Sequence, residues 1–135
     1  MHGTTFSKDK IMNYTIGKFA AQTGISAPLL RYYERQGFLK AERDNAGRRQ
    51  FSGDDAKWAG LIRLLSDTGM PKEQIREYAR LRQKGEKTLP LRLKILEDHR
   101  RMAEEEKTKL EKNLQRLRDE IVRGQERTTR QNRKK

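Results

Sequence analysis

The 135-residue sequence contains no cysteine, and this absence excludes disulfide bonds, thiolate metal sites and thiol catalysis together. It has only three prolines, and 33% of its residues are hydrophobic while 38% are charged. So small an apolar fraction predicts a small core, with much of the chain in helices that are exposed or paired with a second copy. No apolar run reaches the roughly 18 residues of a membrane-spanning helix, and no signal-peptide pattern opens the chain. We therefore expect a cytoplasmic protein.

The charge of the chain is strongly one-sided. Its formal net charge at pH 7 is +13, which favours a polyanionic partner. Residues 123–135 carry six Arg and Lys against one Glu, so this end explains only part of the excess. We expect residues 125–135 to form a basic, disordered tail. Charge alone leaves DNA, RNA and an anionic membrane as alternatives.

Two short helices joined by a tight turn are predicted after a flexible leader of residues 1–13. Apolar residues recur at helical spacing in residues 16–23, and again at Leu30 and Tyr33. Each helix has a hydroxyl N-cap and ends at a glycine, and Pro28 occupies the first turn of the second helix. This layout is typical of a helix-turn-helix. The expected boundary residues are Thr15 and Gly24 for the first helix, and Ser26 and Gly37 for the second.

A β-hairpin with a basic tip is predicted within residues 38–53. A short run of alternating apolar residues from Phe38 to Ala41 is followed by a polar segment. Asn45 and Gly47 in that segment tolerate the positive φ angles of a hairpin turn. The hairpin would form a basic wing, whose arginines are Arg43, Arg48 and Arg49.

A third and a fourth helix complete a head that we expect over residues 14–85. Ser52 and Asp55 have the spacing of a capping box, from which the third helix runs to about Asp67. Gly69 then separates it from the fourth helix. The expected buried side chains are Trp58, Leu61, Ile62 and Leu65 in the third helix, and Ile75, Tyr78, Ala79 and Leu81 in the fourth.

One long helix follows, and its sequence fits a heptad repeat. From about Thr88 to Arg123 it has no glycine, and its one proline stands at the start, so the helix would be roughly 54 Å long. The charged a positions Arg100 and Lys107 favour an antiparallel pair. We therefore expect an antiparallel coiled-coil homodimer over residues 86–124. Its seam would be formed by Leu93, Leu96, Ala103, Leu110, Leu114, Leu117 and Ile121.

The second helix of the helix-turn-helix is expected to present its N-terminal half to the major groove of DNA. Arg31 can donate to guanine or to a phosphate, and Tyr32 should point outward because the adjacent Tyr33 is expected in the core. The wing arginines should reach flanking phosphates, contacts that position a protein without reading sequence. The expected DNA-binding residues are Thr15, Lys18, Ser26, Ala27, Pro28, Arg31, Tyr32, Arg35, Arg43, Asn45, Arg48, Arg49 and Gln50.

No motif in the chain indicates an enzyme or a metal site. There is no Ser/His/Asp set and no glycine-rich phosphate loop. His2 and His99 are too few and too far apart in the sequence to suggest a metal site. We expect no catalytic activity, no metal and no cofactor.

Several segments resemble the MerR family of bacterial transcription regulators. The resemblance implies a mainly α fold, with a winged helix-turn-helix head followed by a long antiparallel coiled-coil dimerisation helix. The regions around Trp58 and residues 92–97 are most similar to AdhR- and NmlR-like regulators of aldehyde or related stress. Those relatives carry a cysteine where this chain has Leu64, so thiol-based sensing is excluded. The resembling segments are YTIGKFA (14–20), GIS (24–26), LRYYER (30–35), GRRQF (47–51), KW (57–58) and TGM (68–70).

The resemblance also implies a mechanism. Such homodimers bind a pseudo-palindromic operator in a promoter whose spacer is too long for RNA polymerase, and they kink and untwist that spacer. The implied partners are promoter DNA, a second copy and RNA polymerase, at the bacterial nucleoid. For the effector, three alternatives stay open: a small ligand between the head and the long helix, a partner protein, or none.

Two functions of other classes are alternatives. A basic helix-turn-helix protein with a long helix can serve as an architectural or recombination accessory factor that bends DNA. A basic coiled-coil protein can instead bind RNA or ribosomes, but that function leaves the LRYYE helix and the wing unexplained.

Overall fold

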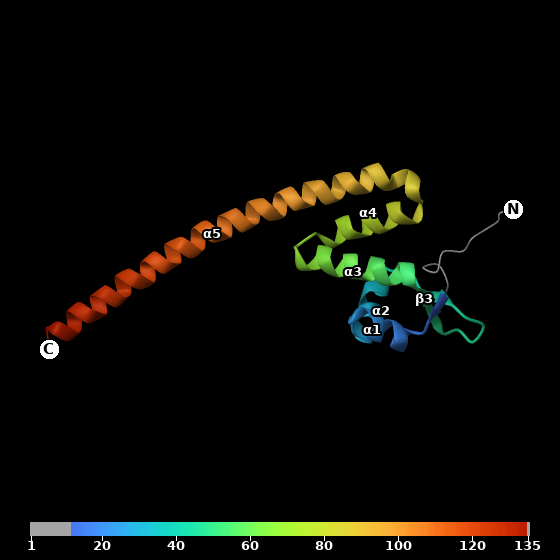
Figure 1. Ribbon diagram of the computed structural model, residues 1–135, viewed down its shortest axis with the longest axis horizontal. Coiled ribbons are helices and arrows are strands. Elements are labelled where there is room, and N and C mark those ends of the chain that lie inside the picture. The colour runs from blue at the N-terminus through green and yellow to red at the C-terminus, as the bar shows by residue number, and fades with distance from the viewer. Residues whose placement is uncertain (1–11, 135) are drawn as a thin grey trace. The chain divides into compact units, whose positions relative to one another are not determined.

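The computed structural model describes residues 12–134, except for the side chains of Met12 and Asn13. Residues 1–11 of the expected leader lie outside the described part, whereas its last two residues belong to a strand. The chain divides into two compact units, Met1–Ile95 and Leu96–Lys135. The elements are β1 (Met12–Tyr14), α1 (Ile16–Thr23), α2 (Ala27–Arg35), β2 (Glu42–Arg43), β3 (Arg49–Ser52), α3 (Gly53–Asp67), α4 (Lys72–Gln83), the 3₁₀ turn η2 (Glu86–Thr88) and α5 (Leu89–Arg133) (Figure 1).

Helices α1 and α2 form the predicted helix-turn-helix. The Thr15 hydroxyl accepts a hydrogen bond from the Lys18 amide at 3.4 Å, and the Ser26 hydroxyl accepts one from the Leu29 amide at 3.3 Å. Both hydroxyls satisfy amides that have no partner within a helix. Gly24 ends α1 with φ 72°, a conformation that glycine adopts without strain. The two predicted N-caps and the predicted turn are therefore confirmed.

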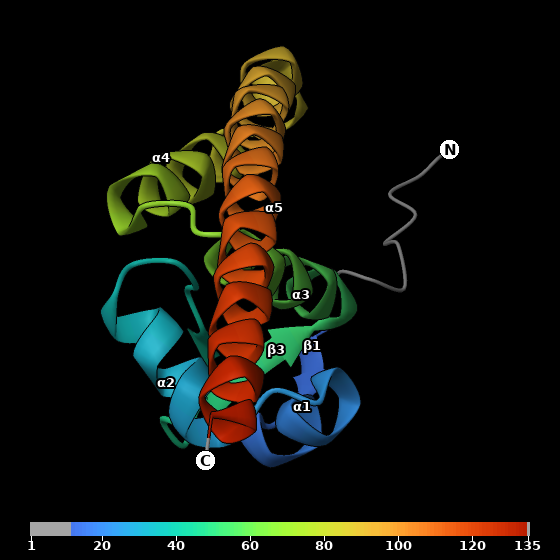
Figure 2. The ribbon, with the colours of Figure 1, turned by 90° about the vertical axis from the view of Figure 1, so that its left-hand side faces the viewer.

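The wing belongs to a three-stranded sheet in the order β1-β3-β2. Figure 2 shows β1 beside β3. The hairpin of β2 and β3 was expected, and Glu42 pairs with Gln50 in it. Strand β1 was not expected, because a three-residue strand shows no alternation long enough to recognise. It forms because its antiparallel partner β3 lies across from it, where Tyr14 pairs with Phe51.

Helices α3 and α4 close the core of the head. The Asp55 amide donates to the Ser52 hydroxyl at 3.0 Å and the Asp55 carboxylate accepts from the Ser52 amide at 2.9 Å, which confirms the capping box. Leu61, expected in the buried stripe, is only half-buried, so that expectation is wrong. The buried hydrophobic residues are Phe19, Ile25, Leu30, Tyr33, Phe38, Leu39, Phe51, Trp58, Ala59, Ile62, Leu65, Met70, Ile75, Tyr78, Ala79 and Leu81.

The head also includes the start of α5, so it extends beyond the expected boundary at Gly85. Arg92 is buried there, and its Nε donates to the Thr88 hydroxyl at 3.0 Å. That hydroxyl in turn donates to the Leu81 carbonyl of α4 at 2.7 Å. The contact between Thr88 and Leu81 crosses from one helical element to another, and no helical periodicity predicts it, so the boundary expected from the sequence lies too early.

Helix α5 continues through the segment that was expected to be a disordered tail. It runs without a break to Arg133, past Gly124. One glycine weakens a helix by only about 1 kcal/mol, so it need not end one. Carboxylates within the helix hold its arginines, as Glu120 does for Arg123 at 2.9 Å and for Arg127 at 3.8 Å. Within the described residues, no helix is long and apolar enough to cross a membrane.

Candidate nucleic-acid interface

Helix α2 has one buried face and one exposed, polar face. Leu30 and Tyr33 lie in the core, and burial raises the pKa of the Tyr33 hydroxyl, which keeps this side chain neutral. Arg31 and Arg35 are exposed on the helix, as is Pro28 in its first turn. A helix whose N-terminal half presents exposed side chains with guanidinium donors has the form of a recognition helix. The flanking residues Thr15, Lys18 and Ser26 are exposed as well, and Ala27 is half-buried.

Tyr32 lies between the two faces of α2 and is half-buried. Lys72, the first residue of α4, places its Nζ 5.4 Å from the centroid of the Tyr32 ring. The ammonium group is attracted by the face of the ring, which brings a further cation beside α2. No pattern in the sequence connects Lys72 with Tyr32, because the two residues are 40 positions apart and belong to different helices.

Arg76 of α4 fixes the C-terminal end of α2. Its Nε donates to the Gln36 carbonyl at 2.7 Å, and its Nη2 donates to the Gln36 side-chain oxygen at 2.8 Å. Its guanidinium also lies 5.8 Å from the centroid of the Phe38 ring. These contacts hold the C-terminal end of α2 against α4. Arg76 is a positioning residue that sequence reasoning missed.

Asp44 organises the turn of the wing. One of its carboxylate oxygens accepts from the amides of Ala46 and Arg48, both at 2.9 Å. The other oxygen accepts from the Arg48 Nε at 3.1 Å and from the Gln50 side chain at 3.4 Å. The backbone hydrogen bond from Arg48 is the largest cause that lowers the pKa of Asp44 below its ordinary 3.8. The turn therefore depends on an ionised carboxylate.

Glu34 holds the wing against α2. Its Oε1 accepts from the Arg49 Nε at 2.6 Å, and its Oε2 lies 3.6 Å from the Arg43 Nη2. The Arg49 side chain is 27% exposed, whereas those of Arg43 and Arg48 are 49% and 74% exposed. Of the three wing arginines, Arg49 is therefore the most buried, and Arg48 is the most exposed. Asn45 is exposed at the tip between β2 and β3.

The residues expected at the dimer seam form a stripe along α5. Five of them are large hydrophobic residues with 39–59% exposure: Leu93, Leu110, Leu114, Leu117 and Ile121. Leu96 and Ala103 on the same stripe are half-buried. An exposed apolar stripe of this length is typical of an interaction surface.

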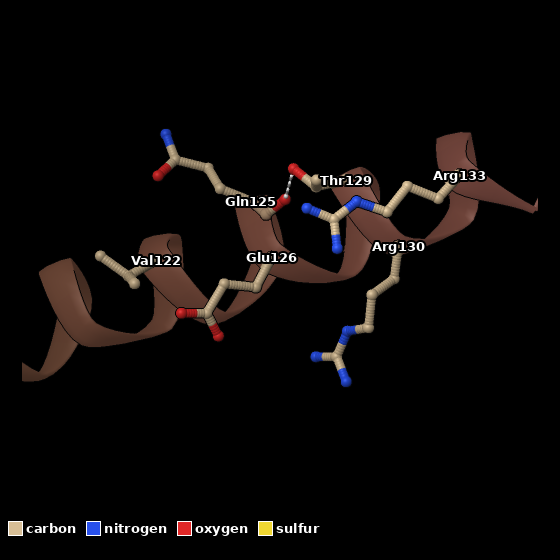
Figure 3. A pocket seen from close by; sticks show the side chains of 6 residues that line it. All are labelled: Val122, Gln125, Glu126, Thr129, Arg130 and Arg133. Atoms are coloured by element: carbon tan, nitrogen blue, oxygen red, sulfur yellow. Dashed lines mark hydrogen bonds between the residues drawn. The ribbon is translucent and has the colours of Figure 1, made fainter.

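The surface of α5 also carries a broad hollow near its C-terminal end. All six residues that line it come from this one helix, as Figure 3 shows. A hollow with walls from a single helix is a groove between neighbouring side chains and encloses no ligand. Among the described residues, no cluster of three or more His, Asp or Glu could hold a metal ion.

Comparison with known proteins connects this arrangement to a group of regulators. A family model described as MerR HTH family regulatory protein matches residues 14–81. An HTH-type transcriptional regulator of Haemophilus influenzae is 38% identical over 88 residues, which are 64% of this chain and 65% of that protein. The HTH-type transcriptional regulator AdhR of Bacillus subtilis is 36% identical over 86 residues, 63% of this chain and 61% of AdhR. The chain thus spans less than two thirds of the length of these curated relatives.

Two solved structures share the fold. HiNmlR, described as a MerR family regulator lacking the sensor domain and bound to promoter DNA, superposes with a TM-score of 0.69 and 32% identity. The match covers 82% of this chain and 89% of HiNmlR. A MerR family transcriptional regulator of Listeria monocytogenes superposes with a TM-score of 0.72 and 29% identity, over 81% of this chain and 83% of its own. The winged helix-turn-helix and the long helix are therefore those of known regulators.

Proposed function

Because the chain belongs to the MerR HTH family of regulatory proteins, we propose that it binds a pseudo-palindromic promoter operator as a homodimer and distorts the spacer DNA. One observation carries this proposal. Helix α2 buries Leu30 and Tyr33, and it presents Arg31 on its exposed side. A guanidinium in that position can form two hydrogen bonds to one guanine.

The wing supplies the second part of the proposed interface. Arg43 and Arg48 are exposed beside the turn that Asp44 organises. Guanidinium groups in such positions attract phosphates and release counterions, which strengthens binding to any duplex. We assign the wing to phosphate contact and α2 to base contact, with Thr15, Lys18, Ser26, Asn45 and Gln50 in supporting contacts to the backbone.

The exposed stripe on α5 supports the proposed homodimer. Two copies that cover each other's stripe would hold two heads at a fixed distance, as a two-fold symmetric operator requires. Two rigidly spaced heads can bend or untwist the DNA between them, because contacts to both half-sites offset the cost of deformation. In this proposal RNA polymerase is a further partner, because the undistorted spacer is too long for it and the homodimer changes the shape of that spacer. HiNmlR is described as bound to promoter DNA, which supports a promoter site here.

The test is genome-wide mapping of bound sites with the full chain in its host, followed by footprinting of the strongest sites. We expect inverted repeats that lie between the two recognition elements of promoters. Sites at recombination ends, or binding spread evenly along the chromosome, would contradict the proposal and support an architectural role. A preference for RNA over duplex DNA in a direct competition would contradict both.

A further inference from the structure

A small surface hollow of about 160 Å³ lies where α3, α4 and the first turns of α5 meet, within the head unit. We call it the aromatic hollow. None of the residues that line it belongs to the candidate DNA interface. Its walls combine three cations, an aromatic pair and one carboxylate: Lys57, Arg82, Arg92, Trp58, Tyr78 and Asp54.

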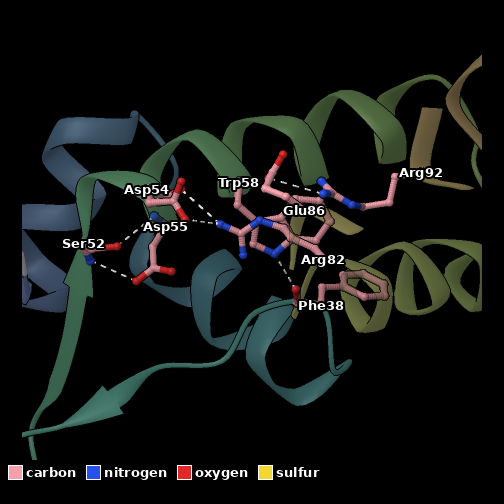
Figure 4. Close-up of polar contacts among 8 residues, drawn as sticks. All are labelled: Phe38, Ser52, Asp54, Asp55, Trp58, Arg82, Glu86 and Arg92. Carbon is pink, nitrogen blue, oxygen red and sulfur yellow. Dashed lines mark hydrogen bonds and ion pairs between the residues drawn. The ribbon is translucent and has the colours of Figure 1, made fainter. Parts of the chain in front are cut away.

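The floor of the aromatic hollow is a stacked pair of aromatic rings. The Trp58 and Tyr78 ring centroids are 5.3 Å apart, with 11° between the ring planes. The indole N–H of Trp58 donates to the Phe38 carbonyl at 2.8 Å, which fixes the orientation of the ring (Figure 4). The pair is therefore held rigidly, and Trp58 and Tyr78 are each only 4% exposed.

Each ring of the pair is in contact with an arginine. The Arg82 guanidinium lies 5.1 Å from the Trp58 centroid, and the Arg92 guanidinium lies 5.9 Å from the Tyr78 centroid. Both distances are within the range of a cation–π interaction. The aromatic hollow thus has guanidinium groups from two different helices, α4 and α5.

The two arginines differ in how their charge is compensated. Arg82 donates to the Asp54 carboxylate at 2.7 Å. The Arg92 side chain is only 9% exposed, and its carboxylate contact, with Glu86, is 3.5 Å long. Figure 4 shows the contact between Glu86 and Arg92. The Glu86 side chain is itself 87% exposed. A buried cation whose counter-charge is distant and solvated is incompletely compensated, and this favours the approach of a further anion.

We propose that the aromatic hollow binds a small organic carboxylate. The carboxylate would accept hydrogen bonds from Arg92. Its apolar body would lie against Leu61 and the parts of Trp58 and Tyr78 that line the hollow. Guanidinium groups suit this chemistry because they can donate two parallel hydrogen bonds to one carboxylate. The hollow is smaller than the pockets of drug-sized ligands, which start at about 300 Å³, so the ligand would have few atoms.

Binding at this place would join three elements of the head. Trp58 belongs to α3, Arg82 to α4 and Arg92 to α5, so an occupant would change how firmly the first turns of α5 are held. If the proposed function is right, the aromatic hollow would be an effector site that couples the head to the dimerisation helix. The binding of an anion does not itself depend on that function.

Trp58 gives a direct measurement, because it is the only tryptophan of the chain. The full chain, without DNA, is titrated with sodium benzoate while the fluorescence of Trp58 is recorded. Benzamide is the matched neutral probe, and inorganic phosphate tests for an anion site without an apolar requirement. We expect a saturable change with benzoate, and binding at least about tenfold weaker with benzamide.

Three variants complete the test. Arg92→Gln should weaken benzoate binding at least about tenfold, because it removes the charged donor. Lys57→Gln should weaken it by a smaller factor of about three, and it leaves the Arg92–Thr88 and Arg82–Asp54 contacts in place, so it serves if the Arg92 variant does not fold. Arg80→Gln, on α4 but outside the hollow, should have no effect.

Several results would overturn the proposal. These are the absence of a saturable change with benzoate, equal binding of benzamide, stronger binding of phosphate, or unchanged benzoate binding in both the Arg92 and Lys57 variants. The titration contains no DNA, so the two proposals are tested independently. A failure to bind benzoate would not contradict operator binding, and a failure to bind an operator would not contradict the benzoate result.

Discussion

The Arg49 Nε of the wing donates to the Glu34 carboxylate of α2 across 2.6 Å. The contact joins β3 to the helix that we propose enters the major groove, and both side chains are about three quarters buried. It sets the angle between the two parts of the candidate interface. In the proposed interface, Arg49 would therefore act first by positioning the wing.

Removing the charge of Glu34 should loosen the wing. We expect Glu34→Gln to lower the free energy of unfolding by about 1–2 kcal/mol, since the hydrogen bond from Arg49 loses its charged acceptor. Urea denaturation measures this. Arg43→Gln is the matched control and should cost less than about 0.5 kcal/mol, because its contact with Glu34 is 3.6 Å long and half-exposed. Equal losses in the two variants would contradict the dominant role of Arg49.

Arg31→Ala tests the recognition helix. We expect the variant to bind a mapped operator more weakly by about 1–3 kcal/mol while it retains most of its affinity for a scrambled duplex. Fluorescence anisotropy with the two labelled duplexes at one salt concentration measures both. Arg80→Ala is the control, because Arg80 lies on α4 and pairs with Glu77 at 2.6 Å. An equal loss on both duplexes would mean that Arg31 contacts phosphate only.

Leu110→Lys tests the dimer seam. The side chain of Leu110 is 59% exposed in the single chain, and in a coiled coil it would occupy a d position. A lysine there would bury a charge against the partner, so we expect monomers by light scattering. Lys112→Ala changes the outer side of the same helix and should leave dimers intact. Dimers that persist in the Leu110 variant would place the interface elsewhere.

The turn of the wing should respond to acid. The pKa of Asp44 is lowered in the folded protein, so ionisation of this carboxylate contributes stability above the ordinary 3.8. That contribution is lost as the pH falls through the lower, folded-state pKa. We expect the amide signals of Ala46 and Arg48 to move in NMR spectra below about pH 4.

Asp44→Asn should remove this titration. The amide of Ile25, which is bonded to the Thr23 hydroxyl and not to a carboxylate, is the internal reference and should not move with it. A transition of the wing amides that persists in the Asn variant would show that another group controls the turn.

Local residues determined much of this structure. Thr15 and Ser26 cap their helices through hydroxyls that reach amides three residues on, and Gly24 adopts its turn conformation because it has no side chain. The same holds for the capping box of Ser52 and Asp55. Interactions over three or four residues are visible in a sequence, so the helix-turn-helix and the start of α3 were predictable.

The long helix was predictable in kind but not in extent. Its heptad pattern indicated a helix and an apolar stripe, and both are present. The sequence predicts that the helix ends near Gly124, whereas the helix continues to Arg133. Contacts of neighbouring residues offset the cost of one glycine in the helix. The hydrogen bond from Arg123 to Glu120 is one such contact.

The sequence by itself determined the family, the caps, the basic wing and the apolar stripe of α5, since each depends on residue type and short spacing. Only the tertiary structure decided that β1 completes the sheet, that Glu34 holds Arg49, and that Arg92 is buried beside Tyr78. These contacts join residues between 14 and about 40 positions apart along the chain. No periodicity connects such residues; the packing of the core brings them together.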